Sequence, residues 1–203
     1  MAYNKFKTET LNELLGIEVE FKNIIPENLP IFYLSDLILT VLNDATNEAL
    51  GTEKSKSEHI VLPVIKELKR QNPNKFSYFS GYKFDVDKKL SLTGYCDFIL
   101  SSIPNTPIIK TPVFLLVEAK NGEIENGIGQ CGAEMYAAQL FNQQHQHPQP
   151  AIYGCVTNAF TWCFLKLENK TLYIDSKHIP LTLAKPQEVL AALQWTLNQC
   201  VKK

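Results

Sequence analysis

The sequence of 203 residues contains no apolar run long enough to cross a membrane. Its start, MAYNKFKTET, lacks the apolar core of a signal peptide, and the chain has neither internal repeats nor a long low-complexity linker. With 45% hydrophobic and 20% charged residues, the composition is ordinary for a globular protein. We therefore expect a soluble cytoplasmic protein with no membrane partner, made of one domain, residues 1–203, in which residues 1–34 form an N-terminal extension of unassigned role.

The sequence also lacks the cysteine spacing of a zinc site or a disulfide framework. No C-x-x-C pair occurs, and the number of cysteines is odd: Cys96, Cys131, Cys155, Cys163 and Cys200. Most of them lie inside apolar patterns. We expect reduced, buried thiols that pack as small hydrophobic side chains.

A strong net charge is absent as well, since the formal charge is −1. This excludes a globally basic nucleic-acid-binding protein. The segment Lys54–Lys89, however, carries nine Lys and Arg residues against four acidic residues, so the rest of the chain is acidic. The segment is either a solvated helix face with a hairpin tip or a local surface that faces phosphates.

The hydrophobic periodicity predicts an alternation of helices and strands. Amphipathic helices are expected at 35–51, where Ser35 is the N-cap, and at 55–70, where Pro63 kinks or restarts the helix. A hairpin at 76–102, a buried strand at 113–117, a helix at 127–142, two or three strands at 151–175 and a helix at 186–201 follow. The order predicts an α/β fold in which helices flank a central mixed sheet.

The stretch VFLLVEAKNG, Val113–Gly122, changes character in its middle. Five apolar residues are followed by Glu118 and Lys120, which are two residues apart and so lie on one face of the strand. If the strand that carries Asp97 pairs with this one, Asp97 and Glu118 can converge on a hard divalent cation, Mg²⁺ or in its place Mn²⁺. Lys120 would face the same cavity and orient a water or offset the charge of a phosphorane-like transition state.

Each of these residues also has a simpler interpretation. Glu118 and Lys120 could be an exposed pair at a fraying strand end, and Asp97 could be a turn residue. Glu58 fits an S-x-x-E capping box that begins at Ser55. Gln130 could be an ordinary surface residue of its helix. The order of these residues along the chain makes the stronger case.

That order resembles the PD-(D/E)XK nuclease superfamily. The family pattern is a helix with a glutamate, a hairpin that ends at an aspartate, a strand that ends in (D/E)-x-K, and a helix; the matching stretches are SEHIVLPVIKEL, LTGYCDFIL, LLVEAK and GQCGAEMYAAQ. YGCVTNAFTWCFLKL also resembles the T-N-G-x-x-W hairpin of the nuclease domains of type I restriction subunits and their free-standing relatives. The resemblance covers about residues 35–175. Cys96 replaces the family's proline, and Ala159 stands where relatives tend to have glycine.

The resemblance implies a restriction-endonuclease-like αβββαβ core and a set of site residues. Asp97, Glu118 and the backbone carbonyl of Ala119 would bind metal, and Lys120 would be the catalytic lysine. Glu58 would be the helix carboxylate that binds metal-bound water or a second ion, with Glu48 a weaker candidate. Gln130 would match a glutamine beside the active site.

The function expected from these residues is Mg²⁺-dependent hydrolysis of phosphodiester bonds by an activated water. DNA is favoured over RNA on family grounds alone. A second hypothesis is a non-catalytic module of the same fold that binds nucleic acid or protein, and a third is an α/β domain with a small-molecule pocket. A homodimer or a protein partner is left open.

Overall fold

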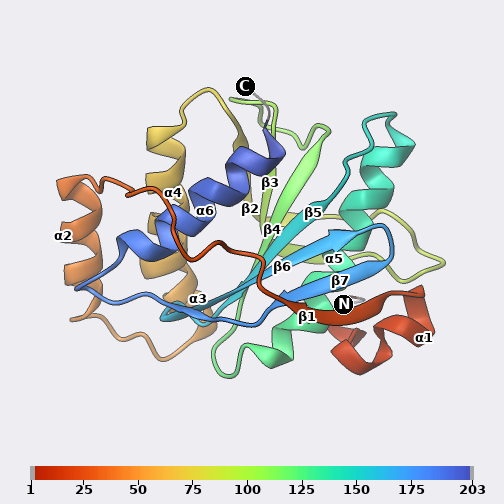
Figure 1. Cartoon of the computed structure of the whole chain (residues 1–203), viewed down its shortest axis with the longest axis horizontal. Coiled ribbons are helices and arrows are strands. Elements are labelled where there is room, and N and C mark those ends of the chain that lie inside the picture. Colours follow the sequence, from red (N-terminus) through yellow and green to blue (C-terminus); the bar gives the residue numbers. More distant parts are fainter. Residues whose placement is uncertain (1–2, 202–203) are drawn as a thin grey trace.

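One mixed sheet of eight strands runs through the chain in the computed structural model, which describes residues 3–201 (Figure 1). The strands are β1 (Glu18–Lys22), β2 (Ser77–Lys83), β3 (Tyr95–Ser101), β4 (Val113–Ala119), β5 (Ile152–Thr157), β6 (Thr161–Glu168), β7 (Thr171–Asp175) and β8 (Ile179–Pro180). Their order is β1-β7-β6-β5-β4-β3-β2, and β8 pairs with the start of β6. The pairs β4–β5 and β1–β7 are parallel, whereas the other pairs are antiparallel.

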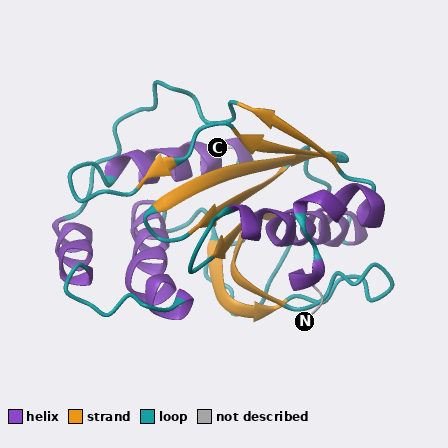
Figure 2. Cartoon of the chain, turned by 90° about the horizontal axis from the view of Figure 1, so that it is seen from below, coloured by secondary structure: helices purple, strands orange, loops and turns teal. Residues whose placement is uncertain are grey.

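Helices cover both faces of this sheet (Figure 2). They are α1 (Leu11–Leu15), α2 (Asp36–Ala45), α3 (Glu53–Lys56), α4 (Leu62–Gln71), α5 (Glu125–Gln144) and α6 (Gln187–Cys200). One apolar core joins α1 and α5 to the sheet, and a second joins α2, α4 and α6 to it. The predicted α/β fold with a mixed central sheet between helices is therefore confirmed. The predicted hairpin is β2–β3, and 151–175 forms three strands.

Two helix ends differ from the prediction. Ser35 does cap α2, since its hydroxyl accepts a hydrogen bond from the Ile38 amide at 3.3 Å, but the helix ends at Ala45 and not at Gly51. The capping box predicted at Ser55 and Glu58 is wrong. Thr52 is the N-cap, and Ser55 is its reciprocal partner. Both positions carry hydroxyl residues, so tertiary packing decides which one begins the helix.

Pro63 lies in a helix that changes its winding. A π-helical turn, Ser57–Val61, connects α3 to α4, and Pro63 lies in the first turn of α4. Proline has no N–H to donate into the preceding turn, and the change to π-helical winding lies directly before it. The helical backbone is continuous through Val61, so the proline restarts the α-helical winding without ending the helix.

The N-terminal extension completes the sheet and supports α5. Strand β1 pairs in parallel with β7, from Glu18 opposite Thr171 to Lys22 opposite Asp175. A Cβ atom on Gly129 of α5 would lie 2.4 Å from the carbonyl carbon of Lys7. Only glycine allows the helix to approach this backbone so closely, which explains a glycine in the middle of a helix.

The five cysteines are all free thiols, as the sequence predicts. Four of them are buried, and Cys200 is half-buried. Burial raises the pKa of the Cys163 thiol to about 12 and that of Cys200 to about 12. These thiols are packing residues with little thiolate at neutral pH.

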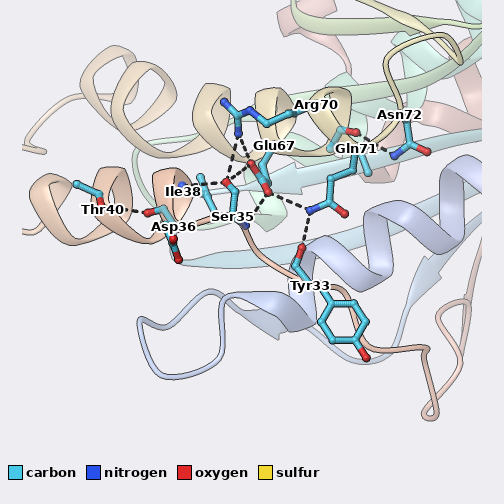
Figure 3. A network of polar contacts seen from close by, with 10 residues as sticks. Tyr33, Ser35, Asp36, Ile38, Thr40, Glu67, Arg70, Gln71 and Asn72 are labelled. Carbon is cyan, nitrogen blue, oxygen red and sulfur yellow. Dashed lines mark hydrogen bonds and ion pairs between the residues drawn. The ribbon is translucent and has the colours of Figure 1, made fainter.

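A buried carboxylate joins α2 to α4 on the second face of the sheet (Figure 3). Glu67 of α4 is completely buried and accepts hydrogen bonds from the Ser35 amide at 3.0 Å and the Ser35 hydroxyl at 2.8 Å. Gln71 donates to the same carboxylate at 3.0 Å, and Arg70 forms an ion pair with it. Burial opposes the charge of Glu67, but these donors and the Arg70 guanidinium outweigh it and lower the pKa of Glu67.

Removal of the Ser35 hydroxyl should therefore destabilise the protein. We expect Ser35→Ala to lower the free energy of unfolding by about 1–3 kcal/mol, since the helix loses its cap and Glu67 loses a donor. Urea denaturation measures this value. The matched control is Thr40→Ala, an exposed hydroxyl on the same helix, which should change the value by less than about 0.5 kcal/mol. Equal losses in the two variants would contradict the structural role of Ser35.

Candidate active site at the ends of β3 and β4

The strands that carry Asp97 and Glu118 are neighbours, as the sequence predicts. β3 and β4 pair antiparallel with Phe98 opposite Val117. Asp97 precedes Phe98 on β3, and its side-chain Oδ2 accepts a hydrogen bond from the backbone amide of Ala119 on β4 at 2.8 Å. Asp97 is thereby fixed beside the residue that separates Glu118 from Lys120.

Four side chains form a connected line from β4 to α5. The Lys120 ammonium donates to Glu118 Oε1 at 2.6 Å and to Gln130 Oε1 at 3.2 Å. The amide nitrogen of Gln130 in turn donates to Glu134 Oε1 at 3.1 Å. The structure thus brings Glu118, Lys120 and Gln130 together and adds Glu134, which the sequence analysis did not single out.

Two carboxylate oxygens in this cluster have no hydrogen-bond partner. Glu118 is 2% exposed and Glu134 is completely buried, and Oε2 of each lacks a partner. Burial raises the pKa of Glu118 well above its ordinary value, and the nearby charges of Glu134 and Asp97 add to the shift. Burial also raises the pKa of Glu134, to about 8, and that of Asp97. The site thus holds more carboxyl groups than its one lysine can balance, and burial favours their neutral, protonated forms.

Lys120 keeps its positive charge in this setting. Its side chain is 18% exposed, and burial opposes the charge, but the attraction of Glu118 outweighs burial and raises the pKa of Lys120. Glu53, at the start of α3, raises the same pKa and also that of Asp97. Lys120 is therefore a cation and a hydrogen-bond donor at neutral pH.

The two residues after Lys120 are held from three sides. The Asn121 carbonyl accepts a hydrogen bond from the Lys56 ammonium at 2.7 Å, and its side-chain amide donates to the Gly51 carbonyl at 3.2 Å. The side-chain amide of Asn158 donates to the Gly122 carbonyl at 3.3 Å. The loop that leaves β4 is thus tied both to α3 and to the turn between β5 and β6.

Glu58 lies apart from this cluster. It is exposed in the π-helical turn, and its ionic partner is Lys54, at 3.8 Å. None of the polar contacts of Glu58 reaches Asp97. The role of Glu58 as the helix carboxylate therefore stays a prediction, and its exposed position does not favour that role. Glu53, five residues earlier, is the helix carboxylate whose charge acts on Asp97 and Lys120. Ala119 is buried, and its amide, not its carbonyl, makes the contact with Asp97.

Glu134 had a signal in the sequence. It is four residues after Gln130, so the two side chains share one face of a helix. From Gly127 to Ala138 the sequence contains mostly small and apolar residues, and such a stretch of helix is usually buried, with any acid that it contains. Glu53 had no such signal, because its nearness to the site depends on how α3 lies against the loop after β4.

Several cations of the basic segment Lys54–Lys89 have partners within the protein. Lys69 donates to the carbonyl of Pro73 at 2.6 Å and to that of Phe76, Arg70 pairs with Glu67, and Lys83 pairs with Asp85 at 3.0 Å. These cations stabilise loops and helices. Lys56 is the residue of the segment that contacts the loop beside Lys120.

The donor set at this site fits a cation such as Mg²⁺ better than a soft metal. Within residues 3–201 no three His, Cys, Asp or Glu side chains are grouped so as to hold a metal ion by themselves. Mg²⁺ is held by one or two carboxylates, with waters and substrate phosphates as its other ligands. The unpartnered Oε2 of Glu118, close to Asp97, meets that smaller requirement.

Comparison with known proteins adds no relative. No protein-family model matches the sequence, and a search of the curated proteins found no match. Among residues 3–201, no helix is both long enough and apolar enough to span a bilayer.

The charge of Glu134 should make stability depend on pH. Its pKa of about 8 in the folded protein lies above the ordinary value of 4.5, so the folded state binds more protons between these values. The contribution of Glu134 to stability is then fully present below about pH 4.5 and is lost as pH rises toward 8. We expect Glu134→Gln to be more stable than the parent by a margin of a few kcal/mol that grows from about pH 5 to about pH 8.

The measurement is urea denaturation in EDTA across this pH range. Glu125→Gln, an exposed glutamate on the same helix, is the matched control and should show no growing margin. A pH-independent difference between Glu134→Gln and the parent would contradict the buried carboxyl.

The two helix glutamates should differ in their effect on Asp97. We expect Glu53→Gln to lower the pKa of Asp97, because the charge of Glu53 raises it, and Glu58→Gln to leave it unchanged. An NMR titration of the aspartate carboxyl carbons measures both. A larger effect from Glu58→Gln would place Glu58 beside the site, as the resemblance implies.

Proposed function

We propose that the protein is a Mg²⁺-dependent nuclease that hydrolyses phosphodiester bonds of DNA at the cluster of Asp97, Glu118 and Lys120. The observation that carries the proposal is the excess of buried carboxylate oxygens over positive charge at the end of β4. A divalent cation would remove that excess, and with its bound waters and a phosphate it supplies Lewis-acid chemistry for hydrolysis.

Each residue of the cluster has a role in this proposal. Asp97 and Glu118 would hold the cation, and the hydrogen bond from the Ala119 amide would keep Asp97 in place. Lys120 would donate hydrogen bonds to a phosphate oxygen or to the attacking water and would offset charge in the transition state. Gln130 would hold the ammonium from the other side, with its own amide oriented by Glu134.

The topology supports the same proposal. A helical segment, the antiparallel strands β2, β3 and β4, helix α5, and strand β5 parallel to β4 follow one another along the chain. This succession supports the αβββαβ core that the resemblance implies. The fold alone does not establish catalysis, so the argument for a nuclease depends on the cluster.

A non-catalytic module of the same fold is the second candidate. It is favoured by the closed contact between Lys120 and Glu118 and by the lack, within residues 3–201, of three acidic or other metal-binding side chains around one point. Such a module would bind its partner without divalent cations. Metal binding by the purified protein separates the two candidates.

The test is cleavage of linear, circular and single-stranded DNA with Mg²⁺, Mn²⁺ or EDTA. We expect cleavage with either metal and none in EDTA. Lys120→Ala should lower the rate at least about 100-fold, because the transition state loses a positive charge. Glu118→Gln should abolish cleavage and weaken cation binding in calorimetry, because an amide is a weaker ligand for Mg²⁺ than a carboxylate. The fold should stay intact, since glutamine has nearly the same shape as glutamate.

The chain offers a matched control for this experiment. Lys166 and Glu168 of β6 are also two residues apart and form an ion pair at 2.8 Å, two strands away from β4 in the sheet. Lys166→Ala should retain the parental cleavage rate. A parent protein that neither cuts any DNA nor binds either cation would overturn the nuclease and favour the non-catalytic module.

A further inference from the structure

The turn between β5 and β6 is held by an unusual number of side-chain hydrogen bonds. The Thr157 hydroxyl donates to the Thr161 carbonyl at 2.8 Å and accepts from the Ala159 amide at 2.9 Å. Asn158 Oδ1 accepts from the amides of Phe160 and Thr161 at 3.2 and 2.9 Å. The turn is therefore rigid, and the side chains at its tip have fixed positions.

Ala159 adopts a backbone conformation that favours glycine. Its φ is +80°, which an L-residue with a side chain rarely adopts, and the residue is completely buried. The Trp162 indole N–H donates to the Ala159 carbonyl at 3.0 Å and holds it there. Strained backbone of this kind persists where the surrounding structure over-determines it and is common at functional sites.

What the turn presents is an exposed aromatic ring. Phe160 follows the strained Ala159, and 47% of its surface is exposed. A rigid turn gains no stability from an exposed phenyl ring. The ring lies at the edge of a cavity of about 440 Å³.

The cavity has an apolar floor and a mixed rim. The buried side chains of Leu42, Ala45, Ile60 and Leu181 line it, and Phe160, Leu183, Glu48 and Thr182 lie at its exposed edge. Its volume is in the range of small-ligand pockets, about 300–1,000 Å³. An apolar cavity with a few polar groups at its rim suits a flat, partly polar ligand.

Two residues of the cavity wall are tied to the loop after Lys120. Leu50 lies directly before Gly51, and the Gly51 carbonyl accepts a hydrogen bond from Asn121. Phe160 lies two residues after Asn158, which donates a hydrogen bond to the Gly122 carbonyl. Two residues of chain span about 7 Å at most. Along these connections Phe160 and the cavity wall lie within about 20 Å of Lys120, or roughly six nucleotides along a strand at about 3.4 Å per nucleotide.

We propose that Phe160 and this cavity bind one unpaired nucleobase of the substrate, within about six nucleotides of the scissile phosphate. The inference depends on the proposed nuclease function and narrows its substrate to DNA with an unpaired or extruded base near the cleavage site. The ring of Phe160 stacks on the base, and the cavity receives its edge. Glu48 accepts a hydrogen bond from an exocyclic amino group of the base.

The chemistry of the wall favours a base over other ligands. Base–aromatic stacking is tolerant of sequence and is the usual way in which proteins hold single strands. Enzymes that act on an unstacked nucleotide extrude it into a fitted pocket. A phosphate would meet the carboxylate of Glu48 and an apolar floor, and no Lys, Arg or His lines the cavity to pair with its charge.

The experiment measures binding separately from cleavage. Short DNA strands that carry 2-aminopurine are titrated with the protein in EDTA, either as single strands or with the 2-aminopurine as the unpaired base of a one-base bulge. Cleavage of the same strands is followed with Mg²⁺. We expect Phe160→Ala to weaken binding of the bulged and single strands on the order of ten-fold. Phe160→Trp should retain it, and fully paired duplex should bind about equally to all variants.

Phe21→Ala is the matched control, because Phe21 is a more exposed phenylalanine, at 75%, on the edge strand β1. It should bind all strands as the parent does. Thermal melting of every variant verifies the fold. The proposal is overturned if the parent cuts DNA but Phe160→Ala binds bulged strands as tightly as Phe21→Ala does. If the parent protein neither binds nor cuts any DNA, both the proposed nucleobase site and the proposed nuclease function are overturned.

Discussion

The cost of negative charge in a buried place determines the arrangement around β4. Glu118 and Glu134 approach one another from the sheet and from α5, Asp97 lies beside them, and one lysine stands between. Desolvation favours the neutral forms of the acids, and Lys120 favours the charged form of its neighbour. A further positive charge would therefore favour the ionised forms of these acids, and the apolar residues of β4 that precede Glu118 carry none.

The position of Lys120 depends on how closely α5 packs. A Cβ atom on Gly127 would lie 3.0 Å from Cγ of Lys120 and 2.6 Å from a methyl group of Val156, so glycine lets the helix press the lysine stem against the sheet. Two residues later, Gly129 lets the backbone of the N-terminal segment lie against the same helix. The first residues of the chain thus help to position a side chain more than a hundred residues away.

The sequence predicts the elements well because each is encoded locally. The run Val113–Val117 is apolar because both faces of β4 are buried, and Ser35 is a cap because a hydroxyl precedes an amphipathic helix. It predicts the convergence of Asp97 and Glu118 only through the assumption that their strands pair. It does not predict the cap at Thr52 or the influence of Glu53, because both depend on where α3 lies against the loop after β4.

The pairing of β1 with β7 has a consequence for the order of assembly. Glu18 finds its backbone partner at Thr171, so β1 has no partner until the strand about 150 residues further along has been synthesised. Loop closure over such a separation slows folding. Before β7 forms, both edges of β1 are unpaired, whereas in the folded protein only the outer edge remains open to other chains.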